Sequence, residues 1–118
     1  MGLFEVKKVL NNPFAYQGQV KSSELKIAGL IQRRRLQILI HSRLYYVLNT
    51  NIIDDSTFDC WGKELVELQN KHPEIASKIC YAKEFKGWLG HSGAYLPLED
   101  SWVVNKTAYL LNLRLNIP

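Results

Sequence analysis

The amino-acid sequence predicts a small, mainly α-helical domain, and three observations support this fold class. Apolar residues recur at three- and four-residue intervals in three separate stretches, as they do where one face of a helix is buried. Residues that start or stop helices bound these stretches. The chain has 118 residues, 47% of them hydrophobic and 22% charged, which suits one compact globular domain with its own core. We therefore expect a single domain over residues 1–118.

The first helix is predicted over residues 23–48. Gly29 marks either a kink in this helix or its true beginning. The preceding residues 1–21 form an N-terminal extension, in which asparagines, a proline and a glycine interrupt any long pattern and predict a short strand or helical turn followed by a loop. The apolar positions that share one face of the helix are Leu36, Ile40, Leu44 and Val47.

A second helix is predicted to begin at Asp54 or Asp55. Either aspartate can accept hydrogen bonds from the exposed amide groups of the first helical turn. The helix should end near Lys71 or His72, because Pro73 cannot continue it. The two helices, joined by a short turn, are expected to form an antiparallel hairpin. The apolar positions of the second helix are Phe58, Trp61, Leu65 and Leu68.

The hairpin accounts for residues 22–74, and residues 75–118 are expected to form an irregular segment and a closing helix. Residues 75–99 are rich in aromatic residues and glycine, which is typical of irregular structure or a short β-hairpin packed on helices. The closing helix should begin at Asp100 or Ser101, which can cap it. Its predicted buried face consists of Val104, Ala108, Leu111 and Leu115.

The chain is mildly basic, with a net charge of +4, which permits contact with nucleic acid without requiring it. The dense basic run is Arg33, Arg34 and Arg35. Three successive residues point around most of the circumference of a helix, so we favour a solvated helix surface over a stripe that follows phosphates. Nucleic-acid binding through these residues and Arg43 is a weaker alternative.

Other classes of site and location are not indicated. The histidines His41, His72 and His91 lack metal-ligand spacing, so no metal site is expected. Cys60 and Cys80 do not form a CxxC pair, and we expect two reduced, structural thiols. No apolar stretch reaches the roughly 18 residues that span a bilayer, and the first residues do not form a signal peptide. A cytoplasmic protein without membrane contact is therefore expected.

The most informative stretch runs from His41 to Glu74 and reads HSRLYYVLNTNIIDDSTFDCWGKELVELQNKHPE. It contains an aromatic pair, a turn, an aspartate, an aromatic residue, a second aspartate and a helix that ends in His-Pro-Glu. This stretch resembles subdomain Ia of bacterial NAD-dependent DNA ligases. The residues that carry the resemblance are Tyr45, Tyr46, Asp55, Phe58 and Asp59.

In the ligase family this subdomain binds the nicotinamide mononucleotide (NMN) half of NAD. The resemblance implies that Tyr45 and Phe58 stack on the ligand and that Tyr46 contacts the ribose or phosphate. It also implies that Asp55 and Asp59 are polar partners of the nicotinamide and ribose. The chemistry is consistent, because aromatic faces and carboxylates attract the flat, cationic nicotinamide ring. The ligases have tyrosine where this chain has Phe58, so a hydroxyl group is missing here.

The resemblance leaves the role of these residues open between two readings. The three aromatic residues could instead hold the hairpin together as core residues. The two aspartates could serve only as a helix cap and a first-turn charge.

Catalysis is not expected, because the 118-residue sequence contains no KxDG motif, the site of the nucleophilic lysine in ligases. The later sequence, FKGWLGHSGAYLPLEDSWVVNKTAYLL, resembles the tails of small stand-alone proteins of phages and prophages. We therefore expect a non-catalytic protein in the cytoplasm of a bacterial host that binds NMN or NAD. The alternative is a protein–protein interaction module that inhibits a host enzyme or a defence system, as anti-CRISPR proteins do. The sequence leaves the oligomeric state open.

Overall fold

The computed structural model describes residues 20–116, with side chains as far as residue 112. This part of the chain contains five α-helices, one short 3₁₀ helix and no strand. The predicted mainly α-helical fold is confirmed for it, and the structure expected for residues 1–19 lies outside it. The elements are η1 (Ser22–Glu24), α2 (Leu25–Tyr46), α3 (Asp55–Lys71), α4 (Pro73–Ala76), α5 (Ala82–Phe85) and α6 (Ser101–Asn116).

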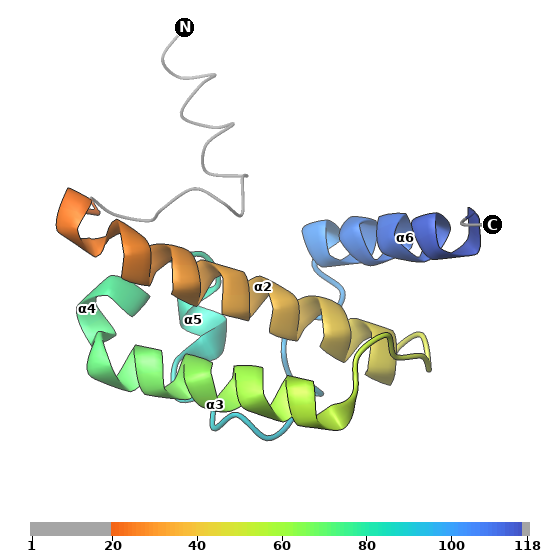
Figure 1. The fold of residues 1–118 in the computed structure, drawn as a ribbon, viewed down its shortest axis with the longest axis horizontal. Coiled ribbons are helices and arrows are strands. Elements are labelled where there is room, and N and C mark those ends of the chain that lie inside the picture. The colour runs from red at the N-terminus through yellow and green to blue at the C-terminus, as the bar shows by residue number, and fades with distance from the viewer. Residues whose placement is uncertain (1–19, 117–118) are drawn as a thin grey trace, which may run out of the picture.

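Helices α2 and α3 form the predicted antiparallel hairpin, which Figure 1 shows as the longest feature of the molecule. The carboxylate of Asp54 accepts a hydrogen bond from the backbone N–H of Thr57 at 2.8 Å, so Asp54 rather than Asp55 caps α3. Helix α3 ends at Lys71, as predicted. Pro73 then occupies the first turn of α4, where a residue without an N–H is tolerated.

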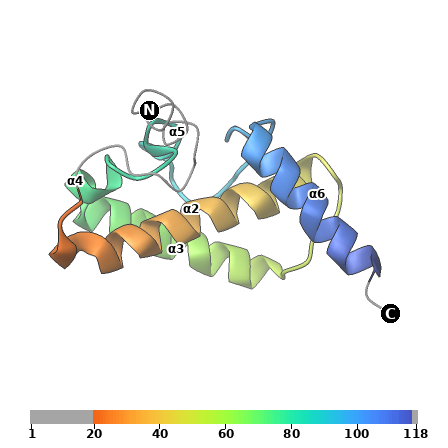
Figure 2. The same ribbon diagram turned by 90° about the horizontal axis from the view of Figure 1, so that it is seen from above.

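Helix α2 is buried around most of its circumference. It contacts α3, α4 and α6, and α6 crosses its C-terminal half obliquely (Figures 1 and 2). The predicted core positions Leu36, Ile40 and Leu44 are buried. Val47 is 42% exposed, because the helix ends at Tyr46. The core also takes apolar residues from other faces of α2, namely Ala28, Ile31, Ile38 and Leu39.

The prediction of a solvated arginine surface is wrong for Arg35, which is only 2% exposed. Its Nη1 lies 3.0 to 3.1 Å from the carbonyl oxygens of Ala76, Ile79 and Cys80. Its Nε donates to Oε1 of Gln69 at 2.9 Å. Burial lowers the pKa of Arg35 to about 10, so the guanidinium keeps its charge at neutral pH. The end of α4 leaves carbonyl oxygens that need donors, and Arg35 supplies them from α2.

Residues 75–99, expected to be irregular or a short β-hairpin, contain no strand, and the end of α4 and the four-residue helix α5 interrupt an otherwise irregular course. Gly90 adopts a left-handed conformation with φ of +88°. A Cβ atom on Gly62 of α3 would lie 2.8 Å from the carbonyl oxygen of Gly90. Glycine at these two positions lets the segment lie directly against α3. The packing brings residues 91–94 next to the turn of the hairpin.

Helix α6 begins at Ser101, as expected, and Asp100 caps it. The carboxylate of Asp100 accepts hydrogen bonds from the backbone N–H of Trp102 at 3.0 Å and from the hydroxyl of Tyr81 at 2.7 Å. One carboxylate therefore both starts α6 and ties it to the chain before α5.

The predicted buried face of α6 is wrong in its first two turns; of the other two predicted positions, Leu111 is half-buried and the side chain of Leu115 lies outside the described residues. Val103 and Thr107 are buried, whereas Val104 is half-buried and Ala108 is exposed. The hydroxyl of Thr107 donates to the carbonyl oxygen of Val103 at 2.9 Å, which removes the cost of burying it. A polar residue thus occupies a core position that an apolar pattern cannot reveal.

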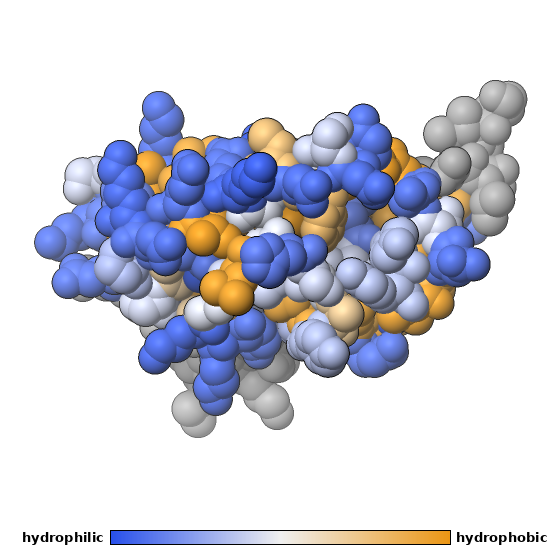
Figure 3. All heavy atoms as spheres, turned by 90° about the horizontal axis from the view of Figure 1, so that it is seen from below, coloured by the Kyte–Doolittle hydropathy of each residue, from blue (hydrophilic) through white to orange (hydrophobic). Residues whose placement is uncertain are grey.

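The outer face of α3 is polar, as its helical pattern predicts. Leu65 is buried, while Lys63 and Glu67 are exposed. Figure 3, which views the molecule from the side of α3, shows hydrophilic residues over most of this face and apolar residues in separate patches. Among the helices described, none has both the length and the apolar character needed to cross a membrane.

Candidate functional site

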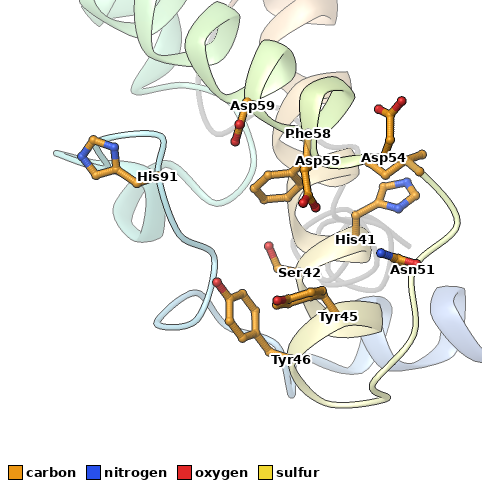
Figure 4. Close-up of a pocket in the computed structure, with 11 residues that line it drawn as sticks. His41, Ser42, Tyr45, Tyr46, Asn51, Asp54, Asp55, Phe58, Asp59 and His91 are labelled. Atoms are coloured by element: carbon orange, nitrogen blue, oxygen red, sulfur yellow. The ribbon is translucent and has the colours of Figure 1, made fainter.

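A cavity of about 290 Å³ lies between the C-terminal end of α2 and the N-terminal end of α3 (Figure 4). The segment that follows α5 forms a further edge. All five predicted site residues are at this cavity, and their role in binding a ligand stays a prediction. The lining residues are His41, Ser42, Tyr45, Tyr46, Asn51, Ile53, Asp54, Asp55, Phe58, Asp59 and His91.

Three aromatic side chains stand around the cavity. Tyr45 and Tyr46, from the last turn of α2, are 55% and 46% exposed, so neither is a core residue. Their rings meet edge to face with centroids 4.9 Å apart. Phe58, from the first turn of α3, is half-buried against the core and lies on the opposite side of the cavity from Tyr45 (Figure 4). The alternative that these aromatic residues are core residues of the hairpin therefore holds only in part for Phe58 and is wrong for the two tyrosines.

Three exposed carboxylates, Asp54, Asp55 and Asp59, line the α3 side of the cavity. Among the residues described, no lysine or arginine lines it. Hydrogen bonds from Thr57 and Ser56 hold the pKa of Asp54 below its ordinary value, so this carboxylate is ionised at neutral pH. The α3 side of the cavity is accordingly negative and favours a cation.

His41 and Ser42 lie on α2 one helical turn before the two tyrosines. The ring of His41 packs on that of Trp61, with centroids 5.4 Å apart. Burial lowers the pKa of His41, so its imidazole is neutral at neutral pH. Within the described part of the chain, neither Nδ1 of His41 nor Oγ of Ser42 has a hydrogen-bond partner, although both atoms are buried.

The segment after α5 is held at the edge of the cavity by Ser92. Its Oγ forms a hydrogen bond of 3.0 Å with the hydroxyl of Tyr46, and its carbonyl oxygen accepts one of 2.7 Å from Nε1 of Trp88. A Cβ atom on Gly93 would collide with the hydroxyl of Ser42. The segment can therefore pack this closely against α2 only because residue 93 is a glycine.

Sequence reasoning missed several lining residues, and only some carry a signal in the sequence. His41 and Ser42 precede the tyrosine pair by four residues, which is the spacing that brings side chains together on one helix face. That spacing could have identified them. His91 reaches the cavity through the packing of glycines on α3, which no local pattern reveals.

The arginines proposed as a nucleic-acid surface are mostly engaged within the protein. Arg34 pairs with Glu64 at 3.0 Å, Arg35 is buried, and Arg43 donates to a backbone carbonyl oxygen at 2.8 Å. Arg33 alone among the four is exposed. They do not form a continuous basic surface.

Two further features concern metal and redox chemistry. In residues 20–116, no group of three or more histidine, cysteine, aspartate or glutamate side chains is placed to hold a metal ion. Cys60 is exposed and Cys80 is buried, and both are free thiols.

A known protein family matches the part of the chain that forms the hairpin. The family is described as "DNA ligase-like, N-terminal NAD+-binding domain", and it matches residues 24–78. This range contains the whole of α2, α3 and α4, and the five residues predicted to form the site.

Individual DNA ligases also match this chain. The ligase of Endomicrobium trichonymphae is 30% identical over 93 residues, which cover 70% of this chain and 14% of the ligase. That of Flavobacterium johnsoniae is 44% identical over 51 residues, which cover 43% of this chain and 8% of the ligase. The chain thus spans 14% or less of the length of these two relatives, and no solved structure matches it significantly. Residues 24–78 are therefore a DNA ligase Ia-like region, similar to the N-terminal NAD+-binding domain of DNA ligases.

Proposed function

We propose that the cavity binds a nicotinamide nucleotide, either NMN or the corresponding half of NAD+, and that the protein binds this ligand without catalysis. One observation carries the proposal: the five residues implied by the ligase resemblance line one cavity together. The name of the matching family points to the same class of ligand.

The chemistry of the cavity suits an oxidised nicotinamide ring, which is flat and cationic. Tyr45 and Phe58 offer ring faces from opposite sides, and each aromatic contact with a cation contributes about 0.5–2 kcal/mol. Asp55 and Asp59 supply negative charge and accept hydrogen bonds from amide and hydroxyl groups. A volume of about 290 Å³ is just below the roughly 300–1,000 Å³ typical of ligand pockets, so a mononucleotide fits better than a whole dinucleotide.

Tyr46 is proposed to contact the ribose or phosphate. A tyrosine hydroxyl can donate one hydrogen bond and accept another, so Tyr46 can contact a ligand while it remains bonded to Ser92. Phe58 provides stacking alone, which makes its contribution weaker than that of the tyrosine found in ligases by roughly 0.5–1.5 kcal/mol.

Binding without catalysis is part of this proposal, and it is supported by the sequence of residues 1–118, in which no KxDG motif occurs. A binding protein of this kind would sense or sequester the nucleotide. The resemblance of residues 85–111 to small phage and prophage proteins is consistent with such a role in an infected bacterial cell.

Isothermal titration calorimetry with NMN tests the proposal. Tyr45→Ala should weaken binding about 2- to 30-fold, which corresponds to the loss of one cation–π contact. Asp55→Asn should weaken it about 10-fold, because the amide can still accept a hydrogen bond but the negative charge that strengthens this bond and attracts the cationic ring is lost. Two control variants change residues that lie outside the cavity and are exposed like Tyr45 and Asp55. They are Tyr109→Ala, where the tyrosine is 56% exposed, and Glu67→Gln on the outer face of α3.

The controls should bind NMN as the unmodified protein does. Equal weakening by Tyr45→Ala and Tyr109→Ala would contradict a stacking role for Tyr45. Absence of NMN binding by the unmodified protein would contradict the proposed function itself.

A surface beside the cavity favours the second candidate function, an interaction with a host enzyme or a defence protein. Val47, Leu48 and Ile52, in the turn between α2 and α3, are 42%, 37% and 42% exposed, next to the exposed tyrosine pair. Exposed apolar and aromatic residues in one place are typical of protein interfaces. Leu48→Ser should abolish such an interaction and leave NMN binding unchanged, as calorimetry with each ligand would show.

A further inference from the structure

We propose that Ser42 is a specificity-determining residue of the cavity and that its hydroxyl donates a hydrogen bond to the carbonyl oxygen of the nicotinamide carboxamide. The inference rests on the proposed function and extends it to a residue that the ligase resemblance did not include. It also identifies the carboxamide as the chemical group of the ligand that the cavity recognises.

The hydroxyl of Ser42 is in an unusual state for a residue inside a helix. Ser42 is 1% exposed, and its Oγ has no partner within residues 20–116. A buried hydroxyl in a helix commonly donates to the carbonyl oxygen one turn earlier, as Thr107 does to Val103 at 2.9 Å. A buried polar group without a partner destabilises the protein, so its presence at a cavity points to a partner supplied by a ligand.

The orientation of Ser42 agrees with this inference. Figure 4 shows its oxygen at the wall of the cavity, between Phe58 on one side and the tyrosines on the other, and the oxygen itself is covered by the residues packed against it. A ring stacked between Tyr45 and Phe58 would have the hydroxyl at its edge, and the proposed hydrogen bond requires residues 91–94 to shift enough to uncover the Oγ. Gly93 packs directly against the Oγ of Ser42, because a Cβ atom at residue 93 would overlap this oxygen, and it leaves no space on that side for a second partner.

The surrounding groups favour a carboxamide over a carboxylate. A carboxamide has both a donor and an acceptor, so its NH₂ can donate to Asp55 or Asp59 while its oxygen accepts from Ser42. The carboxylate of nicotinic acid would place a negative charge beside these aspartates. His41, which is neutral at neutral pH, adds no positive charge that would compete with the cationic ring.

The test compares two ligands and two variants by calorimetry. The ligands are NMN and the pyridinium mononucleotide that lacks the carboxamide, and the variants are Ser42→Ala and the control Thr107→Val. We expect Ser42→Ala to weaken NMN binding about 2- to 10-fold, as for loss of one neutral hydrogen bond, and to leave binding of the pyridinium analogue unchanged. Its melting temperature without ligand should be equal to or higher than that of the unmodified protein, because no internal hydrogen bond is lost.

Thr107→Val is the matched control, since it removes a buried hydroxyl that has partners and lies away from the cavity. It should lower the melting temperature and leave the binding of both ligands unchanged. Equal binding of NMN by Ser42→Ala and the unmodified protein would overturn the inference, and so would equal weakening for the two ligands. Failure of the unmodified protein to bind either ligand would instead overturn the proposed function on which the inference rests.

Discussion

Replacing Arg35 with methionine tests whether a buried cation holds the hairpin to the chain after α4. Methionine has a similar length and no donors. The carbonyl oxygens of Ala76, Ile79 and Cys80, at 3.0 to 3.1 Å from Nη1, would lose their donor. Each buried group left unpaired costs about 1–3 kcal/mol, and removing the cost of burying a guanidinium offsets part of the sum. We expect a net loss of about 3–5 kcal/mol in the free energy of unfolding.

Thermal and urea denaturation followed by circular dichroism measure this loss. A domain of this size has a total stability of about 5–15 kcal/mol, and each kcal/mol shifts its melting temperature by several degrees. Arg35→Met should therefore lower the melting temperature by about 10–25 °C. The control is Arg33→Met, two residues earlier on the same helix, whose side chain is exposed. Its effect should lie within about 0.5 kcal/mol.

The comparison between the two arginine variants decides the outcome. Equal melting temperatures for Arg35→Met and Arg33→Met would refute the reasoning. The guanidinium would then contribute nothing beyond the apolar stem that methionine also supplies.

Three further predictions concern the residues around the cavity. Asp54→Ala should lower the melting temperature and Asp54→Asn should leave it nearly unchanged, because an amide oxygen can still accept the hydrogen bond from Thr57; an equal loss for both would contradict the capping role. The pKa of His41 is lower in the folded than in the unfolded protein, so its contribution to stability is complete above its ordinary value of 6.5 and is lost as the pH falls below it. The melting temperature of the unmodified protein should therefore fall more between about pH 7 and pH 5 than that of His41→Gln, and parallel profiles would contradict this origin. Gly93→Ala should lower both the melting temperature and the affinity for NMN, because the added methyl group collides with the hydroxyl of Ser42. Wild-type values in both assays would contradict this prediction and show that residues 91–94 can move away from Ser42 at no measurable cost.

The helical hairpin could be predicted from the sequence because its signals are local. The spacing of Phe58 and Leu65, the capping aspartate and Pro73 fix the bounds of α3 within a residue. The closing helix shows the limit of such patterns. There the buried face includes Thr107, whose hydroxyl is satisfied inside its own helix, so a count of apolar residues selects the wrong face.

The burial of Arg35 could not be predicted, because its partners are carbonyl oxygens of a segment more than 40 residues later in the chain. The candidate site likewise contains some residues that the sequence could identify and others that it could not. Tyr45 and Phe58 were identified through the ligase resemblance, which covers the hairpin. His91 reaches the cavity through three-dimensional packing alone. Ser42 shares a helix face with Tyr46, four residues later, but its significance comes only from the absence of a hydrogen-bond partner for its Oγ among the described residues.

The central claim is that the cavity of the hairpin binds a nicotinamide nucleotide, and a thermal-melt titration with NMN, NAD+ and AMP tests it most directly. A ligand at 100 times its dissociation constant adds about 2.7 kcal/mol to the stability of the folded protein. We predict a rise of several degrees in melting temperature with NMN and with NAD+, and no rise with AMP, which lacks the cationic ring. An unchanged melting temperature at millimolar NMN, or an equal rise with AMP, would contradict the claim.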